Sequence, residues 1–223
     1  RQHLYTNAIQ PYDRAPHLLI GFPTRFYPQR QFPNQPEWTE PILIASHDGQ
    51  SFRFWNKSVI PVDEGAGRTG NRSNYLSTGL VPMTNNPAEY AVYASEDRRT
   101  GTSMKLRRFT YRTDGFVTVN TSNKPGHLYT KPLVFKGNRL SLNFQTQPQG
   151  QLQLEILDMA GKALPGFSLA DCVPIMGDHL AKHVQWRNGG SVSQLAGQPV
   201  RLHFVMQQCD LYSFQFQLQK ERP

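Results

Sequence analysis

Apolar and polar positions alternate along most of this chain, in short runs rich in β-branched and aromatic residues. A period of two places successive side chains on opposite faces of a strand, and the Gly, Pro, Asn and Asp residues between the runs are typical of turns. The helical period is confined to two short turns, at residues 168–171 and 193–196. The pattern therefore predicts an all-β protein. The expected strands are residues 17–22, 42–46, 53–55, 77–81, 89–95, 106–111, 116–119, 126–129, 133–135, 139–145, 151–157, 181–185, 200–206 and 210–217.

The first half of the chain repeats one plan. Residues 42–55 form an apolar strand, an Asp-Gly turn and an aromatic-rich strand, and residues 106–119 repeat this plan around a second Asp-Gly pair. Hairpins repeated in this way are typical of propeller blades of about 40–50 residues each. Two or three blades fit before residue 116, which is fewer than a closed ring needs. We therefore expect residues 1–122 to be the C-terminal blades of a propeller-like domain.

The second half forms a separate domain over residues 123–223, after a linker at 120–126 that contains Pro and Gly. Its last strand places Tyr212, Phe214 and Phe216 on one face. Such alternation in a set of short strands is typical of two sheets packed face to face. We expect a jelly-roll-like β-sandwich.

The charge balance is basic. The chain carries 24 Lys and Arg against 16 Asp and Glu, a net charge of +8 that is divided about equally between the two halves. The densest basic cluster lies within residues 98–112, where it fits either a nucleic-acid contact or a solvated basic hairpin. No recognition helix or RNA-binding motif accompanies it, so we expect no nucleic-acid partner. An anionic polysaccharide is a further candidate partner.

The sequence offers little support for a metal site or for redox chemistry. Cys172 and Cys209 lie in no CxxC or Cys/His metal spacing. They either form a disulfide across the second domain or stay as two buried thiols, and we favour the thiols. Asp171, Asp178 and Asp210 are candidate calcium ligands, but their spacing follows no fixed motif. We therefore expect no metal and no cofactor.

Two features concern the chain as a whole. No run of 18 apolar residues is present, so we expect no membrane span. The chain starts at Arg1 rather than Met, and we interpret it as a mature or excised piece of a longer protein.

Six longer stretches carry a family likeness. They are YTNAIQPYDRAPHLLIGFPTRF (5–26), SHDGQSF (46–52), RRFTYRTDGFVTV (107–119), TKPLVFKGNRLSLNF (130–144), LEILDMAGKALPGFSLADC (154–172) and VSQLAGQPVRLHFVMQQCDLYSFQF (192–216). The chain resembles planctomycete and Bacteroidetes proteins described as glycosyl hydrolase-like. Those proteins carry a five-bladed β-propeller distantly similar to glycoside hydrolase families 32 and 43, followed by a β-sandwich.

The resemblance implies a carbohydrate partner, an extracellular or periplasmic location and an active site at the propeller hub. In families 32 and 43 three hub carboxylates act as nucleophile or base, as stabiliser and as general acid, as glycosidic cleavage requires. This sequence departs from that pattern, since the opening blades and their first Asp motif are absent, as are Arg-Asp-Pro and Glu-Cys-type signatures. We expect the missing N-terminal part of the same protein to be a partner, and the fragment alone to be catalytically incomplete.

The first candidate site lies at the entry of the strand at 17–22. Asp13, Arg14 and His17 place an acid, a guanidinium and an imidazole within five residues. This set suits sugar hydroxyls or a tuned carboxylate, and the alternative is an ordinary Asp–Arg pair in a loop. We take Asp13 as a catalytic candidate, and Arg14 and His17 as substrate-binding candidates.

Two further candidate sites follow. Glu96 ends an apolar strand and could act as a general acid, although the arginines after it favour a solvated, ionised side chain. Arg72, Asn74 and Tyr75 belong to a Gly-rich loop, and they suit sugar hydroxyls and a pyranose face unless the loop is only a surface connection. Asp48 is expected to be the turn residue of an Asp-Gly hairpin.

The function predicted from these features is that of the C-terminal portion of a glycoside hydrolase-like protein acting on a poly- or oligosaccharide. The alternative is a non-catalytic carbohydrate-binding or structural β-sandwich module. The absence of a recognisable acid pair leaves open whether the chain is an enzyme.

Overall fold

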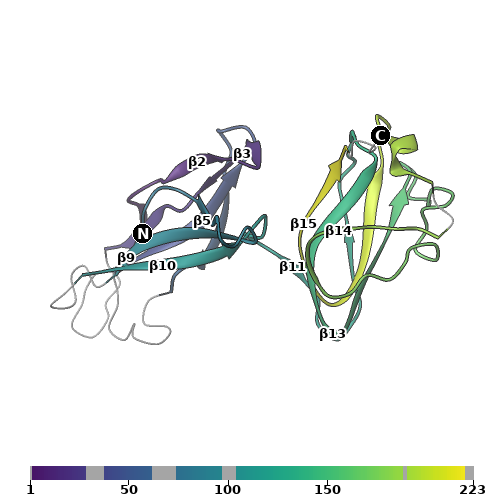
Figure 1. Cartoon of the computed structure of the whole chain (residues 1–223). Helices are drawn as coiled ribbons and strands as arrows, with labels where there is room; N and C mark the ends of the chain where they lie inside the picture. Colours follow the sequence, from purple (N-terminus) through teal and green to yellow (C-terminus); the bar gives the residue numbers. More distant parts are fainter. Residues whose placement is uncertain (1, 29–37, 62–73, 97–103, 188–189, 219–223) are drawn as a thin grey trace. The chain divides into compact units, whose positions relative to one another are not determined.

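The computed structural model describes residues 2–28, 38–61, 74–96, 104–187 and 190–218. In this part the regular structure is β-strand throughout, apart from one 3-10 turn, η1 (Val192–Leu195), so the all-β prediction is confirmed (Figure 1). None of the described residues form a helix long and apolar enough to cross a membrane. The chain divides into two units, Arg1–Tyr111 and Arg112–Pro223.

The first sheet of the first unit has the order β1-β4-β5-β3-β2, with β6 also paired to β5. Its strands are β1 (His3–Leu4), β2 (Ile9–Tyr12), β3 (Ala15–Gly21), β4 (Thr24–Tyr27), β5 (Trp38–Ser46) and β6 (Arg53–Ser58). All of the pairings are antiparallel. The sequence pattern did not predict β1, β2 or β4, which have two to four residues each.

The strands β3 and β4 form one bent strand. They pair with β5 in a single register, from Leu19 opposite Ser46 to Tyr27 opposite Trp38. The break falls at Pro23, which has no N–H to donate to the ladder. Its carbonyl still accepts a hydrogen bond from Ile42 N at 3.1 Å. The strands β1 and β2 pair with β4 and β3, so both lie along the other edge of this bent strand.

The second sheet is a smaller meander of order β10-β9-β7, with β8 also paired to β9. Its strands are β7 (Tyr75–Leu76), β8 (Val81–Pro82), β9 (Glu89–Glu96) and β10 (Lys105–Arg112). Ala91 and Val92 of β9 are both fully buried, so both faces of this strand are covered. Two successive antiparallel meanders are consistent with the propeller-like architecture expected for this half.

A buried ion pair lies inside the first sheet. Arg25 and Glu40 are opposite each other on β4 and β5, each 5% exposed, and their side chains form a direct salt bridge. The guanidinium also donates to Asn56 O at 2.8 Å and lies 5.1 Å from the ring centre of Tyr27. A charge enclosed in this way is tolerated only while its partner is present, because an unpaired buried charge carries the full cost of lost hydration.

The second unit is built on two very long strands. Its sheet has the order β11-β15-β13-β14, with β12 also paired to β15. The strands are β11 (Val119–Asn120), β12 (Gly126–Tyr129), β13 (Arg139–Leu157), β14 (Asp178–His183) and β15 (Arg201–Gln217). Because β11 pairs with β15, the chain joins this unit from Arg112 onward, ahead of the boundary at 122–123 expected from the sequence.

The strands β13 and β15 pair from Arg139 opposite Gln217 to Leu157 opposite Arg201. The register shifts near Asn143 and again between Thr146 and Gln151, and such bulges bend a strand and increase its twist. Gly150 lies at the second shift, where a Cβ would collide with the carbonyl oxygen of Gln208. The sequence predicted two strands, 139–145 and 151–157, where the structure has the single bent strand β13. It likewise predicted two strands, 200–206 and 210–217, where the structure has the single bent strand β15.

The bent ladder surrounds a single core. The largest fully buried side chains of this unit come from both halves of β13, from the first half of β15 and from the connection between β13 and β14: Leu140, Leu142, Phe144, Leu152, Leu154, Ile156, Phe167, Leu202, Phe204 and Met206. Isolated bridges such as Leu152 to Ile175 tie that connection to the ladder. The arrangement is consistent with the sandwich-like prediction.

The two cysteines are free thiols buried in this core, as favoured from the sequence. Cys172 Sγ accepts a hydrogen bond from Leu154 N at 3.4 Å. Burial raises the pKa of Cys209 to about 12, with a smaller contribution from the charge of Asp210.

The first prediction concerns the buried ion pair. Replacing Glu40 by Gln leaves the Arg25 charge buried without a counter-charge, so we expect the free energy of unfolding to fall by about 3–5 kcal/mol. The double variant Arg25→Met/Glu40→Leu removes both charges and should be more stable than the single variant. Urea denaturation measures both, with Glu89→Gln as a control. A double variant as unstable as Glu40→Gln would contradict this account.

The second prediction concerns thiol reactivity. At pH 8 the raised pKa makes the thiolate fraction of Cys209 on the order of 1000-fold smaller than that of an ordinary thiol. The native protein should therefore react with a disulfide reagent at least that much more slowly at this residue than the urea-unfolded chain does. The increase in absorbance after mixing measures both rates, and rapid reaction of Cys209 in the native protein would show that it is not buried.

Candidate functional site

Asp13 and Arg14 are the two loop residues of a hairpin, because Tyr12 of β2 pairs with Ala15 of β3. Asp13 is exposed, and both of its carboxylate oxygens lie 2.8 Å from the hydroxyl of Tyr90, which donates to them. Burial of the Tyr90 ring, and next its bond to Asp13, raise the pKa of Tyr90 to about 12. The phenol therefore keeps its proton at neutral pH and holds the carboxylate of Asp13 in one orientation.

Arg14 and His17 are also exposed. The imidazole of His17 is nearly parallel to that of His47, with 6.1 Å between the ring centroids. The hairpin therefore presents an acid, a guanidinium and an imidazole at the surface of the first unit, as its sequence indicates.

Glu96 lies at the far end of β9 from Tyr90. Its side chain is 1% exposed, and its Oε2 accepts a hydrogen bond from Arg107 Nε at 2.6 Å. Six residues of extended strand span roughly 20 Å, so Glu96 lies about that far from the end of β9 that holds Asp13. Paired glycosidase carboxylates lie about 5–10 Å apart. The structure does not bring Asp13 and Glu96 together, and Glu96 is closed to solvent.

The loop candidates have different surroundings. Arg72 lies outside the described residues. Asn74 is completely buried, and its Nδ2 donates to Ile60 O at 3.1 Å while its backbone N donates to Thr39 O at 3.2 Å. These bonds attach Asn74 to the first sheet, so this polar side chain has a structural role. Tyr75 is half-buried, with its ring edge-to-face against Tyr5.

Asp48 is a turn residue, as predicted. Its carboxylate accepts hydrogen bonds from the backbone N of Ser51 at 2.7 Å and of Gln50 at 2.9 Å, and from the hydroxyl of Ser46. These bonds, led by the one from Ser51, lower its pKa to about 2. Gly49 follows with φ of 71°, the left-handed conformation that an Asp-Gly turn uses.

The three aspartates that were candidate calcium ligands each contact a different partner. Asp178 forms an ion pair with Arg112 at 2.7 Å, Asp171 accepts from Ser168, and Asp210 accepts from Thr118. Among the described residues no group of three or more His, Cys, Asp or Glu is suited to hold a metal ion.

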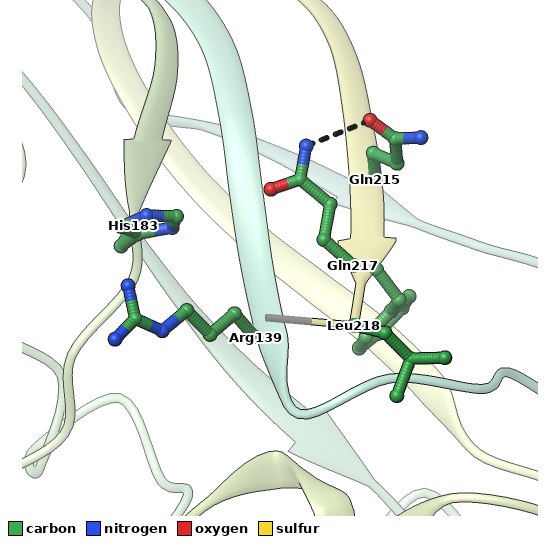
Figure 2. A pocket seen from close by; sticks show the side chains of 6 residues that line it. Arg139, His183, Gln215, Gln217 and Leu218 are labelled. Carbon is green, nitrogen blue, oxygen red and sulfur yellow. Dashed lines mark hydrogen bonds between the residues drawn. The ribbon is translucent and has the colours of Figure 1, made fainter. Parts of the chain in front are cut away.

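An open groove lies on the second unit, at the end of the sheet where β13 begins and where β14 and β15 end (Figure 2). It consists of two hollows of about 520 and 530 Å³ that share Arg139 and His183. The first hollow is lined by Arg139, His183, Gln215, Phe216, Gln217 and Leu218. The second extends past Asn138, Gln185, Trp186, Arg187 and Ser191.

Strand alternation produces the polar side of this groove. Leu140 and Leu142 point into the core, so Arg139 and Ser141 project on the opposite face of β13. Ser141 is paired with His183 on one side and with Gln215 on the other. The groove therefore runs across three neighbouring strands.

Hydrogen bonds join these side chains into one row. Ser141 Oγ donates to Gln217 Oε1 at 3.1 Å and lies 3.0 Å from His183 Nδ1. Gln217 Nε2 donates to Gln215 Oε1 at 2.9 Å (dashed line in Figure 2). Within the described part of the chain, neither the guanidinium of Arg139 nor His183 Nε2 has a hydrogen-bond partner. The row thus offers both donors and acceptors to a ligand.

Among the residues that the structure describes, no Asp or Glu lines either hollow. The sequence analysis did not identify this groove, because its residues come from three strands far apart in the chain. The available signal was Gln215 and Gln217 alternating with Phe214 and Phe216 in the last strand, which shows a polar face opposite the core face.

Comparisons with known proteins gave little. No family model matches the chain, and no curated protein matches it. Among solved structures, it is similar to a crystal structure of a glycoside hydrolase family 43 arabinoxylan arabinofuranohydrolase from Bacillus subtilis in complex with cellotetraose, with 9% sequence identity and a TM-score of 0.27. That alignment covers 96% of this chain and 54% of the other, so the chain spans about half the length of that protein. The family resemblance seen in the sequence stays a prediction.

Proposed function

We propose that this chain is a non-catalytic, carbohydrate-binding part of a glycoside hydrolase-like protein, and that the groove on its second unit holds the saccharide. The observation that carries this proposal is the row formed by the imidazole of His183 and the amides of Gln217 and Gln215, joined through the buried hydroxyl of Ser141. The row borders an open groove, and no carboxylate lies among the described residues that line this groove.

The chemistry of the row matches a sugar. Each hydroxyl of a saccharide both donates and accepts, and the amides of Gln215 and Gln217 do the same. Hydrogen bonds already made within the row fix these side chains, which lowers the entropy that binding would otherwise cost. The two hollows share a wall, so a chain of several sugar units fits better than a single ring.

The same groove does not suit hydrolysis. Cleavage of a glycosidic bond requires one carboxyl group to protonate the leaving oxygen and a second to attack or to activate water. Neither group is present among the described residues that line the groove. Because large saccharides are mostly met outside the cytoplasm, we also propose an extracellular or periplasmic location, and we retain the absent N-terminal part as a proposed partner.

The third prediction tests the groove. Gln217→Ala removes the central member of the row, so we expect affinity for the best-bound polysaccharide to fall about tenfold, or about 1.4 kcal/mol. Affinity electrophoresis over a panel of neutral and acidic polysaccharides identifies that ligand, and calorimetry measures the change. Gln149→Ala, an exposed amide on β13 away from the groove, should bind like the native chain. Absence of retention by every polysaccharide would reject the proposal.

A second candidate function is hydrolysis centred on Asp13. It is favoured by the exposed carboxylate that Tyr90 holds in place beside Arg14. Since Glu96 is buried and distant, this candidate takes its second carboxyl group from outside this sequence.

The fourth prediction separates this candidate from simple binding. If Asp13 is a catalytic residue, Asp13→Asn should lower the release of reducing ends by more than about 100-fold in the protein that carries the second acid. Glu89→Gln, on the same strand as Tyr90, should leave it unchanged. Turnover that survives Asp13→Asn would remove Asp13 from the chemistry.

A further inference from the structure

We propose that the groove selects an anionic saccharide chain, one that carries carboxylate or sulfate groups. This inference rests on the proposed function and names its ligand class. Three basic side chains line the groove: Arg139, His183 and Arg187. In the described part of the chain none of them has an acidic partner.

Elsewhere in this unit, two basic side chains have acidic partners. Arg112 pairs with Asp178 at 2.7 Å, and His203 Nδ1 lies 2.7 Å from Glu155 Oε1. In the groove, Arg139 and Arg187 instead face solvent, and no carboxylate lies among the described residues that line it. A ligand with fixed negative charges would supply the missing counter-charges.

The orientation of His183 is set by the row. Ser141 Oγ donates its only proton to Gln217 Oε1, so it accepts from the N–H at His183 Nδ1. This arrangement leaves Nε2 as the atom that meets a ligand. Figure 2 shows the guanidinium of Arg139 reaching towards the end of β14 that carries His183.

Arg139 is suited to the anion itself. A guanidinium donates two parallel N–H bonds to a carboxylate or a sulfate, and such charge-assisted bonds are about twice as strong as neutral ones. The neighbouring amides then contact the sugar hydroxyls. The groove therefore combines an anion contact and a hydroxyl contact within one hollow.

Nucleic acid fits this groove less well, although it is also anionic. Binding of single strands depends on exposed aromatic rings on which bases stack. The lining aromatics are engaged in the core: Phe216 stacks on Phe135 at 3.7 Å, and Trp186 is 8% exposed with its Nε1 donating to Leu154 O. Trp186 is therefore not available for stacking, and one face of Phe216 is already covered.

The fifth prediction compares matched polymers. The whole chain should bind polygalacturonate, or dextran sulfate, at least tenfold more tightly than fully methyl-esterified pectin or plain dextran, which share the backbones without the charges. The two pairs distinguish a carboxylate from a sulfate as the preferred anion. Arg139→Gln should weaken binding of the preferred charged polymer by about 10- to 100-fold and change binding of its uncharged match by less than about threefold.

Controls exclude a general effect of the net charge. Lys162→Gln removes one exposed cation from the same unit outside the groove and should leave binding unchanged, whereas Arg187→Gln should weaken it. Thermal unfolding shows whether each variant is folded. Equal losses with Lys162→Gln and Arg139→Gln, or tighter binding of single-stranded oligo-dT than of either charged polysaccharide, would overturn the inference.

The outcomes also distinguish the two proposals. Binding of charged and uncharged polymers with equal affinity, lost in Gln217→Ala, would overturn the anion preference and keep the carbohydrate groove. Binding of none of the four polymers or the wider panel would overturn both.

Discussion

The antiparallel ladder between β13 and β15 is the interaction on which the second unit depends. Its two strands pair over almost their whole length and supply most of the large buried side chains. Bulges let the ladder bend, so one pair of strands contributes to both sides of the core. Their outward faces carry the polar row. The hydrophobic packing that stabilises the sandwich therefore also fixes the positions of Ser141, Gln215 and Gln217.

The sequence predicted the kind of structure better than its connections. Period-two alternation identified most strands, and the Asp-Gly pair at Asp48 identified a tight turn that the structure confirms. Alternation could not show that β13 is continuous, because residues 147–150 resemble a loop in composition, whereas the strand continues through them and its pairing with β15 resumes at Gln151. Such a bend is decided by the partner strand, which lies about sixty residues away in the sequence.

The candidate residues illustrate the same limit. Asp13, Arg14 and His17 are exposed together because they belong to one hairpin, and local sequence is sufficient for that inference. Glu96 and Asn74 carry polar side chains that suit a ligand, yet both make internal bonds instead. Glu96 bonds to Arg107, and Asn74 bonds to Ile60 O. Residue type alone does not distinguish a polar group that meets solvent from one that satisfies a buried partner.

The bond between Tyr90 and Asp13 has a mechanical consequence. Asp13 belongs to the first sheet and Tyr90 to the second, so this contact braces one meander against the next. Any cation or hydroxyl that draws the carboxylate away also removes the acceptor of a phenol that is 3% exposed. A ligand bound at the hairpin would therefore weaken the contact between the two sheets. Conversely, closer packing of the two sheets would keep the carboxylate on Tyr90 and so weaken the binding of that ligand.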